Sequence, residues 1–239
     1  MIISEFFYYR IAVLRKRDSS KRRMAISAGI LPIILAAFPI LAWQKRRDTM
    51  STIPQWLHDE VNDYFVVPIR TTPHTVLDIG ANIGAFALRA HREWPSATVF
   101  CYEPMPFNVE KLRENVDGAW CHISASAVRA TAGEDDIHVG DMFVTGGFSK
   151  GARMTNQTIR VQCVAASGLP SCDLVKIDTE GSEVEILSHL NLENTQVIML
   201  EHHSLSDAET LRKMLSPVFE LVHDETSREV GTEVYFRRG

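Results

Sequence analysis

Two acidic residues close neighbouring apolar stretches of this chain, and together they could hold a nucleoside. The run from Val76 to Gly84 reads as a short strand that passes through Asp78 into a turn of small residues. Glycines carry no Cβ, so a ligand can approach such a turn closely. Further on, Glu103 follows a second apolar strand, and an acid at that position accepts hydrogen bonds from ribose hydroxyls in dinucleotide-binding folds. The pair predicts an adenosine-containing cofactor across the carboxyl ends of parallel strands.

A second set of polar side chains follows two later apolar stretches. Asp178 and Glu180 come after one of them, and Glu201 and His203 come after the next. The carboxyl ends of parallel strands border one crevice, so we expect these four side chains to lie together. A carboxylate or a histidine there could take the proton from a hydroxyl nucleophile. His202 is adjacent to His203 and should face the opposite way in an extended chain, so we favour His203 for the site.

Each of these side chains also has a structural explanation. Asp78 could cap the following helix and Glu103 could be a loop charge, while Asp178 and Glu180 could cap a helix that begins near Gly181. We expect Glu183 to be a surface acid in the first turn of that helix. Acids with a histidine can also bind a divalent metal, but the spacing matches no recognised metal motif, so we expect no metal.

The elements that must position these residues alternate between strand and helix, which predicts an α/β fold with a doubly wound, mostly parallel sheet. Expected strands are 75–79, 98–103, 119–124, 173–177 and 196–200, and expected helices are 53–64, 83–93, 107–116, 181–190 and 206–215. The stretch 133–165 breaks the alternation, and we expect a β-rich insertion with a mobile tip at 146–151. The end reads as a hairpin of 219–223 and 233–237 across a loop at 224–231.

Charge is distributed unevenly along the 239 residues, whose formal net charge is −5. Residues 1–50 contain ten Lys and Arg against three Asp and Glu, so the remainder is strongly acidic. An acidic body argues against a nucleic-acid-binding surface. The four cysteines form no CxxC pair, as expected for reduced thiols in a cytosolic protein.

The chain divides into a basic N-terminal extension, 1–50, and a domain at 51–239. Within the extension, residues 24–43 carry no charge and are long enough to cross a bilayer. Basic residues precede this segment in excess, which for a single span would place the domain outside the cytosol, away from a cytosolic cofactor. The alternatives are a shallow anchor that keeps the domain cytosolic, a surface helix, or a true start at Met50. We expect a cytoplasmic domain that is either soluble or held at the membrane by 24–43.

Four segments resemble the FkbM family of S-adenosylmethionine-dependent methyltransferases. They are VLDIGANIGAFAL (76–88), YEPMPFNVEKLREN (102–115), DLVKIDTEGSEVEIL (173–187) and VIMLEHH (197–203), in the order of the family. The resemblance covers roughly residues 55–237. It implies the class I methyltransferase fold, which is Rossmann-like and has seven strands with the last one antiparallel.

The resemblance also implies roles for individual residues. The methionine part and ribose of S-adenosylmethionine would be held by Asp78, Gly80, Asn82 and Gly84, the ribose hydroxyls by Glu103, and the adenine by Ser126 and Ala127. The active site would contain Asp178, Glu180, Glu183 and Glu201, with His202 and His203 beside them. One run departs from the family pattern, because 164–167 reads Val-Ala-Ala-Ser where members often carry a Leu-Asp-Asp-like sequence.

The leading hypothesis is therefore methylation of an oxygen, on a hydroxyl of a sugar, a glycan or a small natural product. One alternative is a module that binds the cofactor without catalysis, which the departure at 164–167 would fit. A nicotinamide-dependent dehydrogenase is less suitable, because the turn reads Gly80-x-Asn82-x-Gly84 rather than G-x-G-x-x-G.

Overall fold

The computed structural model describes residues 53–239 except 117, 141–145, 148–153 and 228. These residues belong to one compact unit, Met50–Gly239. No helix in this described part is long and apolar enough to span a bilayer. The apolar segment 24–43 lies outside the described residues, so its role as an anchor stays a prediction.

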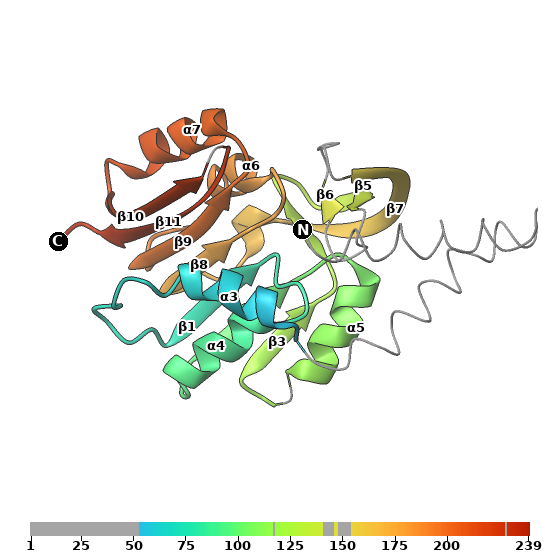
Figure 1. The fold of residues 1–239 in the computed structure, drawn as a ribbon, viewed down its shortest axis with the longest axis horizontal. Coiled ribbons are helices and arrows are strands. Elements are labelled where there is room, and N and C mark those ends of the chain that lie inside the picture. The colour runs from blue at the N-terminus through green and yellow to red at the C-terminus, as the bar shows by residue number, and fades with distance from the viewer. Residues whose placement is uncertain (1–52, 117, 141–145, 148–153, 228) are drawn as a thin grey trace, which may run out of the picture. The chain divides into compact units, whose positions relative to one another are not determined.

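A seven-stranded sheet forms the centre of the domain (Figure 1). Its strands are β1 (Thr75–Ile79), β2 (Thr98–Tyr102), β3 (Cys121–Ser124), β8 (Leu174–Ile177), β9 (Val197–His202), β10 (Phe219–Ser227) and β11 (Val230–Arg237). They lie in the order β10-β11-β9-β8-β1-β2-β3. The pairs from β3 to β9 are parallel, whereas β11 runs antiparallel to both β9 and β10. The predicted parallel sheet with an antiparallel last strand is confirmed.

Helices cover both faces of this sheet (Figure 1). They are α3 (Gln55–Asp63), α4 (Ala85–Glu93), α5 (Pro106–Asn115), α6 (Glu183–Leu187) and α7 (Leu205–Leu215). Successive side chains of a strand point to opposite faces, and β1 shows the result. Val76 packs in the cluster that includes residues of α3, α4 and α5, whereas Leu77 and Ile79 pack with α6 and α7. The predicted doubly wound arrangement is therefore present.

A second sheet accounts for the break in the alternating pattern. It contains β4 (Ala127–Arg129), β5 (Gly133–Gly140), β6 (Gly146–Gly147) and β7 (Met154–Ala165), in the order β4-β7-β5-β6. This sheet buries its own small apolar cluster around Ile137 and Val161. The expected β-rich insertion is confirmed. Its expected tip contains β6, and residues 148–151 of that tip lie outside the described residues.

Two expected boundaries were wrong. The loop expected at 224–231 is mostly strand, because β10 and β11 continue to pair through Asp224 with Glu233 and Thr226 with Gly231. These positions are polar, so an apolar pattern could not reveal them. The helix expected at 181–190 is only α6, Glu183–Leu187. Gly181 has a φ of +102°, which is incompatible with a helix start at that residue.

Candidate active site

The turn after β1 has a left-handed backbone at three positions. The φ angles are +79° at Gly80, +50° at Asn82 and +93° at Gly84. A Cβ on Gly80 would lie 1.7 Å from the carbonyl oxygen of Asp178, so only glycine fits there. The turn after β1 therefore packs directly against the turn after β8. This contact brings the predicted cofactor edge and the predicted catalytic residues into one site.

Glu103 fixes this turn to the end of β2. Its Oε2 accepts a hydrogen bond from the N–H of Asn82 at 2.9 Å. Its Oε1 accepts bonds from the N–H of Met105 at 2.8 Å and from the side chain of Asn108 at 3.2 Å. Burial raises the pKa of Glu103 to about 7, although these hydrogen bonds act in the opposite direction. Glu103 is thus a buried, oriented carboxyl rather than a loop charge.

Asp78 pairs with a buried lysine and does not cap α4, whose N-cap is Gly84. Asp78 lies opposite Lys176 in the register of β1 and β8, on the same face of the sheet. The Nζ of Lys176 is 3.4 Å from Asp78 Oδ1 and 3.5 Å from Asp178 Oδ2. It also donates a hydrogen bond to the carbonyl of Gly80 at 2.7 Å. Burial disfavours the lysine charge, but the carboxylates of Asp78 and Asp178 raise its pKa above the ordinary value.

Lys176 and Tyr64 are site residues that the sequence analysis missed. Tyr64, just after α3, is buried and donates its hydroxyl to Asp178 Oδ2 at 3.4 Å. The signal for Lys176 was a single charge inside the otherwise apolar strand β8. Tyr64 gave no comparable signal, because its contact partner is 114 residues away.

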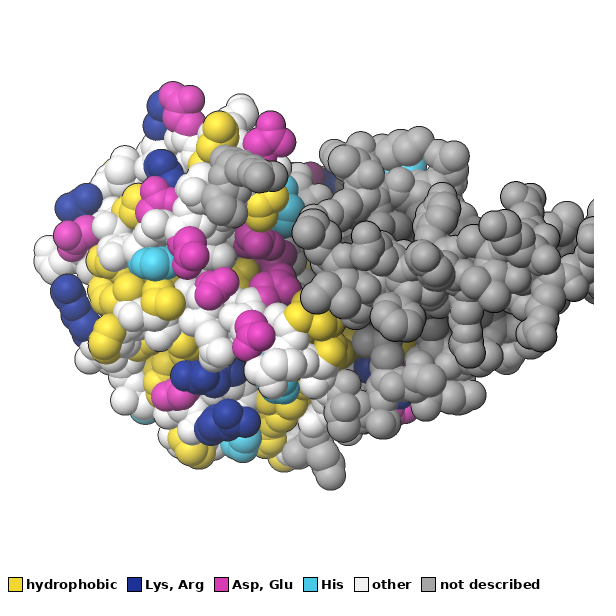
Figure 2. Space-filling model, viewed as in Figure 1, with side chains coloured by type: hydrophobic (Ala, Val, Ile, Leu, Met, Phe, Trp, Pro, Cys, Tyr) yellow, Lys and Arg dark blue, Asp and Glu magenta, His cyan; other side chains and the backbone are white. Residues whose placement is uncertain are grey.

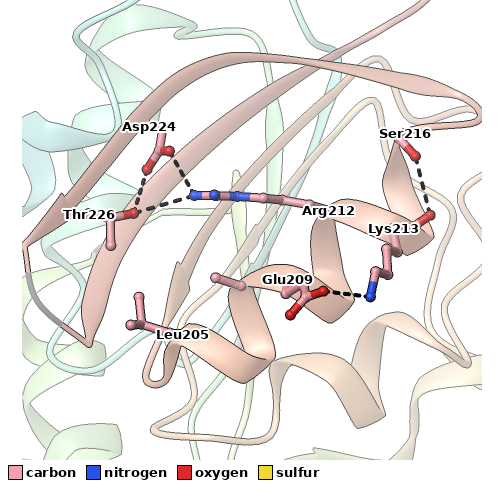
Figure 3. Close-up of a pocket in the computed structure, with 8 residues that line it drawn as sticks. Leu205, Glu209, Arg212, Lys213, Ser216, Asp224 and Thr226 are labelled. Atoms are coloured by element: carbon pink, nitrogen blue, oxygen red, sulfur yellow. Dashed lines mark hydrogen bonds and ion pairs between the residues drawn. The ribbon is translucent and has the colours of Figure 1, made fainter.

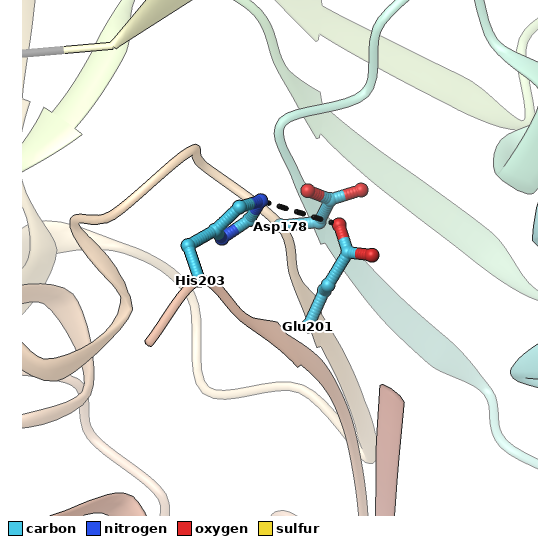
Figure 4. A group of neighbouring side chains, drawn as sticks. All are labelled: Asp178, Glu201 and His203. Atoms are coloured by element: carbon cyan, nitrogen blue, oxygen red, sulfur yellow. Dashed lines mark ion pairs between the residues drawn. The ribbon is translucent and has the colours of Figure 1, made fainter. Parts of the chain in front are cut away.

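Three of the predicted catalytic residues converge at the ends of β8 and β9 (Figure 4). One ligand atom each from Asp178, Glu201 and His203 lies within 4.8 Å of the others. The Nε2 of His203 is 3.4 Å from Glu201 Oε2 and 3.4 Å from Glu180 Oε2. The structure therefore brings together all four predicted catalytic side chains.

Glu183 is not the surface acid that we expected. It is buried, and its Oε1 accepts hydrogen bonds from the N–H and hydroxyl of Thr179 and from the N–H of Gly181, at 2.9, 3.1 and 3.1 Å. The same oxygen is 3.2 Å from Nδ1 of His203. Residue Ser182, and neither Asp178 nor Glu180, is the N-cap of α6. The acids of this turn therefore face the site instead of capping the helix.

The surrounding carboxylates change how His203 and Glu201 ionise. Burial alone would disfavour a charged His203, but the adjacent carboxylates of Glu183 and Glu201 raise its pKa to about 12. Burial and the charge of Asp178 raise the pKa of Glu201 to about 8. His203 is therefore a cation at neutral pH, whereas Glu201 exchanges its proton near neutrality. Acidic side chains gather on the face of the molecule that Figure 2 shows.

His202 faces away from this cluster, as the alternation along β9 requires. It is buried, with Nε2 at 3.2 Å from the hydroxyl of Thr226 and at 4.0 Å from Glu233. Its Nδ1 is 3.3 Å from the carbonyl of Glu229. The preference for His203 over His202 is thus consistent with the geometry.

The two residues expected to flank an adenine lie where the chain leaves β3 for the second sheet. Ser126 is half-buried, and Ala127 is buried in the apolar cluster of that sheet together with Met105. Their contact with a cofactor stays a prediction. The run 164–167, which departs from the family pattern, begins in the last residues of β7, where Val164 and Ala165 pair with β4.

A separate surface pocket of about 440 Å³ lies between α7 and β10 (Figure 3). Its lining includes Leu205, Arg212 and Thr226. None of the predicted cofactor-binding or catalytic residues lines it, so it is not the site described above.

The strand order, the antiparallel β11 and the acids at the ends of β1, β2, β8 and β9 define a class I methyltransferase fold. Residues 78–227 match the family described as the methyltransferase FkbM domain. The chain belongs to this family, which confirms the resemblance found in the sequence.

Two curated relatives are similar to this chain. Hexuronic acid methyltransferase AglP of Haloferax volcanii is 30% identical over 146 residues, which are 58% of this chain and 60% of the relative. The 31-O-demethyl-FK506 methyltransferase FkbM of Streptomyces tacrolimicus is 25% identical over 205 residues, which are 67% of this chain and 78% of the relative. The match thus spans less than two thirds of the AglP relative.

One solved structure has the same fold. The crystal structure of methyltransferase FkbM from Methylobacillus flagellatus KT superposes with a TM-score of 0.51 at 16% identity, covering 72% of this chain and 45% of that one.

Proposed function

We propose that this protein transfers a methyl group from S-adenosylmethionine to a hydroxyl oxygen of a sugar, a glycan or a small natural product. The observation that carries the proposal is the direct packing of the turn after β1 on the turn after β8, at Gly80 and Asp178. It supports the proposal because the edge expected to bind the nucleoside then lies beside a cluster of carboxylates at the carboxyl ends of parallel strands, where such folds bind their ligands. Membership of a methyltransferase family supports this reading over the dehydrogenase alternative.

The residues at this edge suit S-adenosylmethionine. Glu103 is oriented by Asn82 and Met105 at the end of β2, where a carboxylate can accept hydrogen bonds from ribose hydroxyls. The turn from Gly80 to Gly84 would hold the methionine part, and Ser126 with Ala127 would border the adenine. When bound, the cofactor supplies an electrophilic methyl group on a positively charged sulfur, which an excess of carboxylates stabilises.

Glu201 is the residue we propose as the general base. Its pKa of about 8 lies close to working pH, where a base is most efficient. Asp178 lies beside it and is held by Tyr64 and Lys176. His203 carries a proton at neutral pH, so we propose that it orients Glu201 and does not accept the proton itself. In this scheme the acceptor hydroxyl loses its proton to Glu201 as the new oxygen–carbon bond forms.

The acceptor class rests on the two relatives, whose names specify a hexuronic acid and 31-O-demethyl-FK506. Both names describe oxygen-rich small molecules or sugar units. We therefore propose an oxygen acceptor of that kind for this chain.

The test is formation of S-adenosylhomocysteine from S-adenosylmethionine over a panel of uronic acids, neutral sugars and hydroxylated natural products. We expect turnover with at least one acceptor and loss of at least about 100-fold in Glu201→Gln, because general-base catalysis contributes that much. Glu209→Gln, on the exposed side of α7, is the matched control and should retain full turnover. Binding of the cofactor without turnover on any acceptor would instead favour a non-catalytic binding module.

A further inference from the structure

The cluster at the ends of β8 and β9 has the composition and spacing of a metal site. Asp178, Glu201 and His203 each offer one ligand atom, and these atoms lie within 4.8 Å of one another (Figure 4). Two atoms that both lie about 2.1 Å from one ion are at most about 4.2 Å apart. A pair at the 4.8 Å limit would therefore move together by at least about 0.6 Å to share an ion, which side-chain rotation can supply.

Glu183 provides an independent indication of a ligand. Metal-binding histidines almost always direct their second ring nitrogen to a carboxylate, which fixes the ring and leaves the first nitrogen for the ion. Here Nδ1 of His203 faces Glu183 Oε1 at 3.2 Å, and Nε2 faces the cluster. Glu183 is 1% exposed, and no described residue donates a hydrogen bond to its Oε2. Three hydrogen bonds from Thr179 and Gly181 hold its other oxygen.

The balance of charge also favours a cation. Carboxylates of Asp178, Glu180, Glu183 and Glu201 surround the imidazole of His203, and Lys176 is shared between Asp178 and Asp78. A proton and a metal ion would bind the same Nε2 atom. A doubly charged ion interacts with the surrounding carboxylates more strongly than a single positive charge does.

We infer that Asp178, Glu201 and His203 bind one divalent first-row transition-metal ion, with Glu183 positioning the histidine. Two carboxylates and one imidazole form a mixed oxygen and nitrogen set, which suits Mn²⁺ or a neighbouring ion more than Ca²⁺. The role of the ion rests on the proposed function. Binding of the ion would displace the proton from Nε2 of His203, so the histidine would be neutral in this form. One oxygen of Glu201 would bind the ion, and the other would stay available to accept the proton of the acceptor hydroxyl. An open position of the ion would take that hydroxyl, lower its pKa and orient its oxygen toward the methyl group.

The direct test is Mn²⁺ binding to the full chain after treatment with a chelator, measured by the loss of the free Mn²⁺ signal in electron paramagnetic resonance. We expect one bound ion per chain. Glu201→Gln and Asp178→Asn should each weaken binding at least about tenfold, and Glu183→Gln should weaken it about 10- to 100-fold. Glu209→Gln should bind as the unmodified chain does.

Circular dichroism of each variant identifies any that fail to fold. If a variant fails, Mn²⁺ binding to the unmodified chain still tests the metal site. Absence of stoichiometric Mn²⁺ binding to it would overturn the metal site, as would unchanged binding in a folded Glu201→Gln. Turnover of S-adenosylmethionine that persists fully in chelator would overturn the role of the ion while leaving the methyltransferase. One bound Mn²⁺ with the expected variant effects, but without turnover on any acceptor, would support the site and count against the proposed function alone.

Discussion

The ionisation of the buried Glu103 carboxyl should make both stability and cofactor binding depend on pH. Its hydrogen bonds come from Asn82, Met105 and Asn108, and burial raises its pKa to about 7. The pKa of this carboxyl is higher in the folded state than its ordinary value of 4.5, so its protonated form stabilises the fold. This contribution is complete at a pH below 4.5. That contribution to stability is lost as pH rises through about 7. Cofactor binding should respond in the opposite direction, because ribose hydroxyls need the ionised form.

We predict that the affinity for S-adenosylhomocysteine rises with pH between about 5 and 7 and then levels off. The slope should be up to about tenfold per pH unit, as for one proton released on binding. Isothermal titration calorimetry in a pH series measures this. Glu103→Gln should bind more weakly at about pH 8 and show a flat pH profile. A slope that persists unchanged in this variant would assign the proton to another group.

Gly80 and Gly181 form a matched pair for testing the contact between the two turns. Both have a positive φ, +79° and +102°, which costs about 1–2 kcal/mol for a residue with a Cβ. Only at Gly80 would the Cβ also overlap the carbonyl of Asp178. We predict that Gly80→Ala lowers the free energy of unfolding by about 3 kcal/mol and Gly181→Ala by about 1–2 kcal/mol. Urea denaturation measures both, and equal losses would contradict the close contact.

The sequence predicted the residues of the site better than it predicted their partners. Asp178, Glu201 and His203 were recognisable because each follows an apolar strand. Glu183 was misjudged, because its burial depends on Thr179, Gly181 and His203, which one strand pattern does not bring together. Tyr64 reaches Asp178 across 114 residues, and no local pattern encodes such a contact.

At the scale of elements, α7 is fixed to the sheet by an ion pair whose acid is fully buried. The Nε–H group of Arg212 donates to Glu233 Oε1 at 2.5 Å. Its Nη2 donates to Asp224 Oδ2 at 2.7 Å (Figure 3). Tyr235 donates its hydroxyl to the other oxygen of Glu233. Because the Glu233 side chain is 0% exposed, removing Arg212 would leave a buried carboxylate without its cation.

We predict that Arg212→Ala lowers the free energy of unfolding by about 3 kcal/mol, as expected when one partner of a buried pair is removed. Lys213 is the control, since it is adjacent on α7 and pairs only with the exposed Glu209. Lys213→Ala should change stability by less than about 0.5 kcal/mol. Thermal or urea unfolding followed by circular dichroism distinguishes the two, and similar effects would show that Glu233 finds another partner.

The elements themselves were predicted where an apolar period was present. The strands β1, β2 and β8 and the helices α4 and α7 were found within a few residues, because each carries apolar side chains that pack in the core. The extended pairing of β10 and β11 was not found, because Asp224, Glu225, Thr226 and Glu233 are polar. Backbone hydrogen bonds between β10 and β11 stabilise this polar part of the hairpin, and a pattern of apolar side chains does not reveal them.

At the scale of the whole molecule, the described residues belong to one unit that begins at Met50. We predict that a chain starting at Met50 folds and binds S-adenosylhomocysteine as tightly as the full chain, because the candidate site residues named above all lie at or after Tyr64. Calorimetry of both proteins tests this, and loss of binding on truncation would place residues 1–49 in the site.

Sedimentation with lipid vesicles tests the anchor predicted at 24–43. Binding of the full chain but not of the shorter chain would support it, whereas equal behaviour would not.

The position of β11 sets a condition on biosynthesis. This strand follows β10 in the sequence, yet it lies between β9 and β10 and pairs with both. Until it arrives, β9 has an open edge, and unpaired edges of this kind promote association with other chains. Nascent chains of this protein should therefore need protection until β11 has been synthesised. A stop codon placed just before β11 should abolish soluble protein, although every residue of the candidate site would still be encoded.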